Sequence, residues 1–87
     1  MTLDDVATIT GCCLRISGTK RDGEWDYCAR LVDLEVLHNG MLTSASAGAT
    51  TPEFALIVLA EMLSKKRIVV GAYTDKRQEF SLPEVKP

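Results

Sequence analysis

Residues 35–72, EVLHNGMLTSASAGATTPEFALIVLAEMLSKKRIVVGA, decide the fold of this chain. Asn39 and Gly40 predict a tight hairpin turn, because both residues tolerate the positive φ angles that such a turn requires. Thr50 and Glu53 have the spacing of a capping box, with a proline between them, and predict the start of a helix. The segment therefore predicts two strands joined by a turn, then a helix, then another strand.

The predicted helix runs to about Lys66 and has few polar positions. Its sheet-facing residues follow helical spacing, namely Ala55, Val58, Leu59, Met62 and Leu63. Between Phe54 and Leu63 only Glu61 is polar. Phe54 and Ile57 lie away from the sheet-facing stripe, next to Glu61, and these three residues are predicted to form a dimer interface. The alternative is that another segment of the same chain covers them.

The remaining strands are predicted from alternation and turn residues. They cover residues 6–17, 25–37, 41–47, 68–73 and 78–82. Asp22 and Gly23 indicate a hairpin between the first two strands. Near Leu31 and Val32 the apolar residues change to the other parity, which indicates a bulge or a switch of face. The fold class is α+β, with an antiparallel sheet of four to five strands, one helix on a face, and the order β-β-β-α-β-β.

The chain of 87 residues is expected to form a single domain over residues 1–87. Pro83 interrupts the last strand, so residues 83–87 are predicted to be a loose C-terminal tail. The apolar fraction of 46% and the charged fraction of 25% are ordinary for a globular protein.

Composition also narrows the partners and the compartment. The net charge of −2 gives no general attraction to nucleic acid, so direct nucleic-acid binding is not expected. No run approaches the roughly 18 apolar residues of a membrane helix. The N-terminus is acidic, where a signal peptide would be basic. We expect a cytoplasmic protein with reduced cysteines, and no association with membranes.

Cysteine and histidine residues do not form a recognisable site in the sequence. Cys12 and Cys13 are neighbours on a predicted strand and would point to opposite faces, so they would not clamp one ion. His38, the single histidine, lies in a turn, and nothing in the spacing brings it close to a thiol. We therefore predict no metal, no cofactor and no catalytic residue, with the cysteines as buried small thiols.

An acidic region over the first hairpin and second strand is the candidate partner-binding surface. Its residues are Asp22, Glu24, Trp25, Asp26, Asp33 and Glu35. Such a surface would suit a basic groove on another protein. The alternative is that these carboxylates, which alternate with apolar residues, form only the solvated face of a strand.

Two groups of small proteins resemble residues 35–72 in plan. HicB-like antitoxins share a β-β-β-α-β plan and a helix start similar to Thr51-Pro52-Glu53-Phe54-Ala55, although Phe54 stands where a second Glu is usual. Small phage-encoded anti-CRISPR inhibitors likewise combine an antiparallel sheet with one helix. That resemblance implies a protein that occludes a nuclease or its RNA-guided complex.

The sequence thus predicts a non-catalytic, phage- or mobile-element-encoded inhibitor. It would bind a host protein or ribonucleoprotein complex of the CRISPR-Cas kind in the host cytoplasm and block its surface. The alternative is an antitoxin-like or regulatory module that binds a toxin or nucleic acid as a homodimer.

Overall fold

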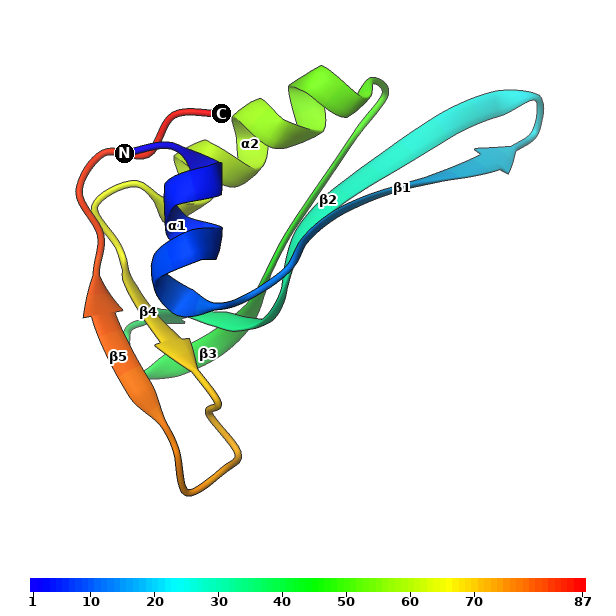
Figure 1. Cartoon of the computed structure of the whole chain (residues 1–87). Coiled ribbons are helices and arrows are strands. Elements are labelled where there is room, and N and C mark those ends of the chain that lie inside the picture. The colour runs from blue at the N-terminus through cyan, green and yellow to red at the C-terminus, as the bar shows by residue number, and fades with distance from the viewer.

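A computed structural model describes residues 1–87 as an α+β fold with an antiparallel five-stranded sheet and two helices (Figure 1). The predicted order of three strands, one helix and two strands is confirmed, and a further helix precedes it. The elements are α1 Leu3–Thr10, β1 Leu14–Arg21, β2 Glu24–His38, β3 Met41–Ala49, α2 Pro52–Leu63, β4 Arg67–Val70 and β5 Gln78–Ser81.

The prediction of a strand over residues 6–17 is wrong for residues 6–10, which lie in helix α1, and is confirmed from Leu14 onward, where β1 begins. The Thr2 hydroxyl accepts a hydrogen bond from the Asp5 amide at 3.1 Å, and the Asp5 carboxylate accepts one from the Thr2 amide at 2.9 Å. This reciprocal capping box starts the helix, and Gly11, with a φ of 71°, ends it. The β-branched residues of this segment favour a strand, but local capping outweighs that preference.

Both predicted hairpin turns are confirmed. Asp22 and Gly23 have φ angles of 52° and 82°, and Asn39 and Gly40 have φ angles of 51° and 79°. Two consecutive residues with positive φ are the signature of a type I′ turn, whose twist matches that of the strands it joins.

Strand β2 is the centre of the sheet and changes its neighbour along its length. One edge pairs with β3, while the other pairs first with β1 and then, from Leu34 to Leu37, with β4. The register with β3 shifts between Arg30 and Glu35, and within this bulge Asp33 has a φ of 65°. The predicted bulge is confirmed here.

Helix α2 packs on β3 and β2 and supplies the centre of the core. Ala55, Leu59 and Leu63 are fully buried, together with strand residues such as Ile68. The cap of this helix is Thr51, whose hydroxyl accepts from the Phe54 amide at 3.1 Å, rather than the predicted Thr50. The helix ends at Leu63, three residues before the predicted end. Neither helix is long and apolar enough to cross a membrane.

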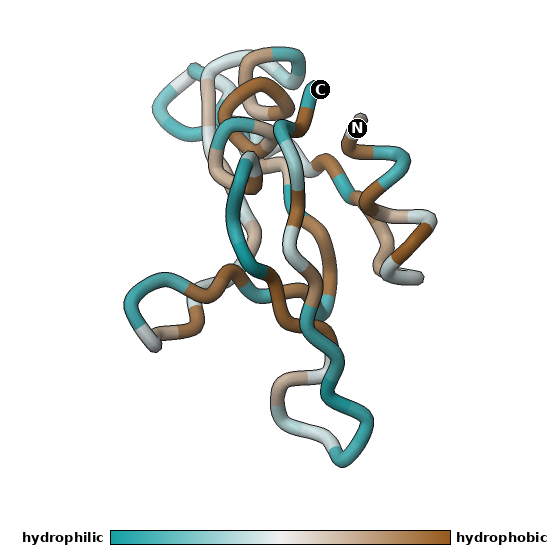
Figure 2. The backbone as a smooth tube through the Cα atoms, turned by 90° about the vertical axis from the view of Figure 1, so that its left-hand side faces the viewer, coloured by the Kyte–Doolittle hydropathy of each residue, from teal (hydrophilic) through white to brown (hydrophobic).

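The C-terminal segment is docked, so the prediction of a loose tail is wrong. Val85 is 4% exposed, and its amide donates to the Ser64 hydroxyl at 2.8 Å. Lys86 bridges to the N-terminus: its amide donates to the Met1 carbonyl at 2.8 Å, and its carbonyl accepts from the Leu3 amide at 2.9 Å. Figures 1 and 2 show the two termini side by side. Pro83 lies beyond the end of β5, but these hydrogen bonds hold residues 85 and 86 in place.

Candidate functional site

The most exposed part of the fold is a two-stranded hairpin, residues 18–27, which we call the arm. Tyr27 pairs with Ala49 at the end of β3, and beyond this pair no third strand joins β1 and β2. All residues of the arm except Tyr27 are exposed. Figure 1 shows the arm extending away from both helices, and the molecule as a whole measures 43 × 25 × 24 Å. An unsupported hairpin buries little surface by itself and offers both of its faces to a partner.

One face of the arm carries two aromatic rings. The rings of Trp25 and Tyr27 stack with centroids 6.1 Å apart and planes inclined by 21°. They cover Gly18 on the facing strand, because a Cβ built there would lie 3.1 Å from Tyr27 Cε1 and 3.3 Å from Trp25 Cε3. Ile16, which by strand alternation shares this face, is 47% exposed, and Trp25 is 49% exposed. Gly18 therefore leaves space for the rings of Trp25 and Tyr27, which together with Ile16 form an exposed apolar surface.

The opposite face of the arm is polar and carries both signs of charge. Asp26 pairs with Thr19, and Glu24 pairs with Arg21. By alternation these side chains point away from the aromatic face. The predicted partner-binding residues Trp25, Glu24 and Asp26 therefore belong to one arm but lie on two faces of it.

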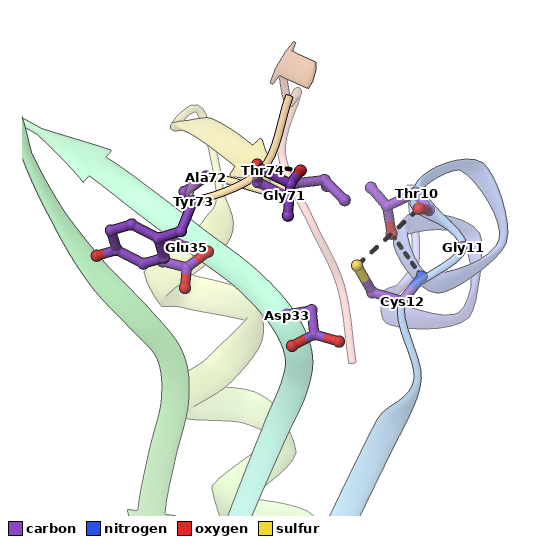
Figure 3. Close-up of a pocket in the computed structure, with 10 residues that line it drawn as sticks. Thr10, Gly11, Cys12, Asp33, Glu35, Gly71, Ala72, Tyr73 and Thr74 are labelled. Carbon is purple, nitrogen blue, oxygen red and sulfur yellow. Dashed lines mark hydrogen bonds between the residues drawn. The ribbon is translucent and has the colours of Figure 1, made fainter. Parts of the chain in front are cut away.

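Of the other three predicted acidic residues, Asp22 lies in the turn at the end of the arm, whereas Asp33 and Glu35 do not lie on the arm. They line an open depression of about 470 Å³, the bulge pocket, beside the β2 bulge. The other walls come from residues 10–12, which begin at the last residue of α1, and from residues 70–74, which begin at the last residue of β4. Figure 3 shows Tyr73 and Glu35 on one side, Thr10 and Cys12 on the other, and Asp33 between them.

The bulge pocket contains two acidic side chains, Asp33 and Glu35, and has the aromatic ring of Tyr73 at its rim. Neither carboxylate has an ion-pair partner, since the one salt bridge of the fold joins Arg67 to Glu79 at 3.8 Å. Tyr73 is 85% exposed. The two carboxylates were identified from the sequence but were not grouped with residues 10–12 and 70–74. These three segments are distant in the sequence, and the bulge in β2 is what brings Asp33 and Glu35 beside the other two.

The predicted dimer residues lie on the outward side of α2. Phe54 is 55% exposed, Ile57 is 39% exposed and Glu61 is exposed. No segment of this chain covers these three residues, so the alternative prediction, in which another part of the chain would bury them, is wrong.

The cysteines are all free and differ in exposure. Cys12 is buried, Cys28 is half-buried and Cys13 is exposed, so the prediction of buried thiols is wrong for Cys13. His38 is the last residue of β2, next to the β2–β3 turn, and its Nε2 lies 3.3 Å from Asn39 Nδ2. No group of three or more potential metal ligands occurs in the fold.

Comparisons with protein-family models, with curated proteins and with solved structures give no match to this chain.

Proposed function

We propose that this chain is a small non-catalytic protein-binding inhibitor, encoded by a phage or mobile element, that acts in the host cytoplasm. It blocks a host defence complex of the CRISPR-Cas kind by inserting the arm into a cleft of that complex. The single observation that supports this proposal is the arm, which carries an exposed stacked aromatic pair on one face and charged side chains on the other.

Insertion into a cleft is inferred from the two-faced arrangement. Trp25 and Asp26 are adjacent on β2 and point to opposite faces, so a flat partner surface would contact only one of them. A cleft contacts both. Trp and Tyr are typical anchor residues of protein interfaces, because they bury a large area with few rotatable bonds.

The charge of the arm refines the predicted acidic surface. The arm has three acids, Asp22, Glu24 and Asp26, against two bases, Lys20 and Arg21. Its slight negative charge suits a cleft with a basic wall, but the aromatic face supplies most of the apolar contact area.

The test is capture of a partner from a bacterial host lysate on the immobilised protein. Wild type is expected to retain one complex, and Trp25→Ala and Asp26→Lys are each expected to reduce its retention. Tyr73→Ala, an exposed aromatic residue outside the arm, is the matched control and should retain the complex fully. Equal retention by wild type and both arm variants would contradict the proposal.

The second candidate is the antitoxin-like or regulatory module that binds nucleic acid. One observation favours it: Arg15 and Arg30 are direct cross-strand partners at the base of the arm, both exposed and without a carboxylate partner. A pair of unpaired guanidinium groups attracts phosphate. Retention of the protein on DNA or RNA that falls with rising salt, and that Arg15→Ala weakens, would favour this candidate over the inhibitor.

A further inference from the structure

Strand β3 has an unprotected edge. It pairs with β2 on one side and with nothing on the other, over nine residues that include no charge and no proline. The other edge strands are protected in known ways: β1 carries Arg15, Lys20 and Arg21, and β5 has four residues with the Arg67–Glu79 ion pair beside it. A long, uncharged edge is a template for another strand.

Helix α2 presents an apolar flank on the same side as this edge. Its opposite flank faces other parts of the chain: Leu56 lies beside Leu3 and Leu14 at a small depression, and the Ser64 hydroxyl donates to the Val85 carbonyl at 3.1 Å. The elements that occupy it, α1 and the C-terminal segment, adjoin β1 and β5, on the other side of β2 from β3.

The apolar flank can be assigned from helix geometry. At 100° per residue, Val58 lies about 160° around the helix from Leu56, and Met62 lies about 160° from Ser64. They therefore face past the outer edge of β3. Val58 and Met62 pack against the core but stay partly exposed, and Phe54, about 40° around the helix from Val58 on the outward side, is 55% exposed.

We propose that the β3 edge pairs antiparallel with β3 of a second copy of this chain. The pairing would make one sheet continuous across a two-fold axis, with the two α2 helices side by side over it. The strand supplies backbone hydrogen bonds, and the flank formed by Phe54, Val58 and Met62 supplies apolar contact. The inference is independent of the arm, since each arm lies beyond the Ala49 end of its own β3.

Charge is the reason for choosing a second copy as the partner. A two-fold axis at the middle of β3 places the central residues opposite their own copies and each end of the strand opposite the other end, and β3 contains no charge that would be repelled. The two helices would run antiparallel, which brings Glu53 in the first turn of one toward Lys65 after the last turn of the other. The interface is thus self-complementary in its backbone, its apolar flank and its charges.

Sedimentation equilibrium of the full chain tests the pairing. Wild type is expected at twice the chain mass of 9.5 kDa. Ser44→Lys, at an exposed position of β3, places two lysines close to the axis and is expected to give monomers. Thr19→Lys, a lysine substitution on the edge strand β1, is the control and should remain dimeric. Circular dichroism verifies that all three proteins are folded.

A second pair of variants separates this dimer from one formed by the outward face of α2 alone. Phe54→Glu is expected to dissociate the dimer, because Phe54 lies about 40° around the helix from Val58, whereas Ile57→Glu is expected to leave it intact, because Ile57 lies about 100° from Val58. In hydrogen exchange, the amides of β3 should gain protection as the protein concentration rises.

Three results would overturn the proposal. They are a wild-type monomer even at millimolar concentration, a dimer that Ser44→Lys does not weaken, and equal dissociation by Phe54→Glu and Ile57→Glu. A monomer that instead gains β3 protection when an extended peptide is added would assign the edge to a different partner.

Discussion

Leu31 and Leu34 lie three positions apart on β2, and both are buried in the same core, with 1% and 2% of their surface exposed. On a regular strand, residues three apart point to opposite faces. The bulge between Arg30 and Glu35 resolves this conflict by turning the chain at Asp33. As a result β2 exchanges β1 for β4 as its neighbour without exposing its apolar residues.

The first prediction concerns Asp33. Its φ of 65° is tolerated by aspartate but disfavours a β-branched side chain. Asp33→Val is expected to lower the free energy of unfolding by about 1–2 kcal/mol, and Asp33→Gly to lower it much less. Urea denaturation measures both. Equal losses for the two variants would show that backbone conformation at Asp33 does not limit stability.

The second prediction concerns Gly18. A side chain at this position meets the stacked rings of Trp25 and Tyr27, so Gly18→Val is expected to displace them and change the near-ultraviolet circular dichroism of the tryptophan. Partner retention should fall with it, if the arm binds as proposed. Because the site is exposed, stability should change by less than about 1 kcal/mol.

Gly48→Val is the control for Gly18. A Cβ at Gly48 has only one neighbour within 4 Å, the Tyr27 carbonyl oxygen at 3.7 Å, which is ordinary contact. The control should leave the aromatic spectrum unchanged. An unchanged spectrum in Gly18→Val as well would mean that the stack does not depend on the glycine.

The third prediction concerns the capping box of α1. Hydrogen bonds from the backbone and side chain of Thr2 hold the pKa of the Asp5 carboxyl below its usual value. A lowered folded-state pKa stabilises the fold above the unfolded-state pKa, whose usual value is 3.8, and this contribution is lost as the pH falls through the lower folded-state value. The difference in the free energy of unfolding between wild type and Asp5→Asn should therefore be constant near neutral pH and should shrink below about pH 4.

Thr2→Ala tests the same box without removing a charge. It deletes the hydroxyl that caps the Asp5 amide and is expected to cost about 1 kcal/mol at neutral pH. Wild type, Asp5→Asn and Thr2→Ala are compared by thermal unfolding between about pH 3 and about pH 7. This interval includes the pH range in which aspartate carboxyl groups usually titrate. If the stability difference between wild type and Asp5→Asn does not vary with pH, the charge of the Asp5 carboxylate does not cause that difference.

The fourth prediction concerns the docked C-terminus. Val85 is 4% exposed within the core cluster, so Val85→Ala is expected to destabilise the fold by about 2 kcal/mol. Glu84→Ala, one residue earlier and exposed, should change stability by less than about 0.5 kcal/mol. Chemical denaturation compares them. If the C-terminal segment were loose, Val85→Ala and Glu84→Ala would both change the free energy of unfolding by the same small amount.

Local chemistry made several parts of the fold predictable. Asn39-Gly40 and Asp22-Gly23 define their turns because few residues adopt two consecutive positive φ angles at low cost. The parity change near Leu31 located the bulge, and the threonine-proline-glutamate start located α2 to within one residue. The capping box of Thr2 and Asp5 is also visible in the sequence and indicates α1, but the β-branched residues after it favoured a strand.

The candidate site depended on contacts between distant segments. Trp25 and Asp26 were predicted together because they are adjacent, yet strand alternation puts them on opposite faces. Asp33 and Glu35 were grouped with them by sequence distance, and the bulge moves them into a pocket with residues 70–74.

The turns, the strand alternation and the start of α2 follow from the local sequence, because hydrogen bonds and φ preferences within a few residues set these features. Three other features follow from long-range packing: the C-terminal segment is held against the N-terminus and α2, β2 changes its partner strand, and the edge of β3 stays open. These outcomes depend on which surfaces are buried against each other, and that is settled by the whole core rather than by any one segment.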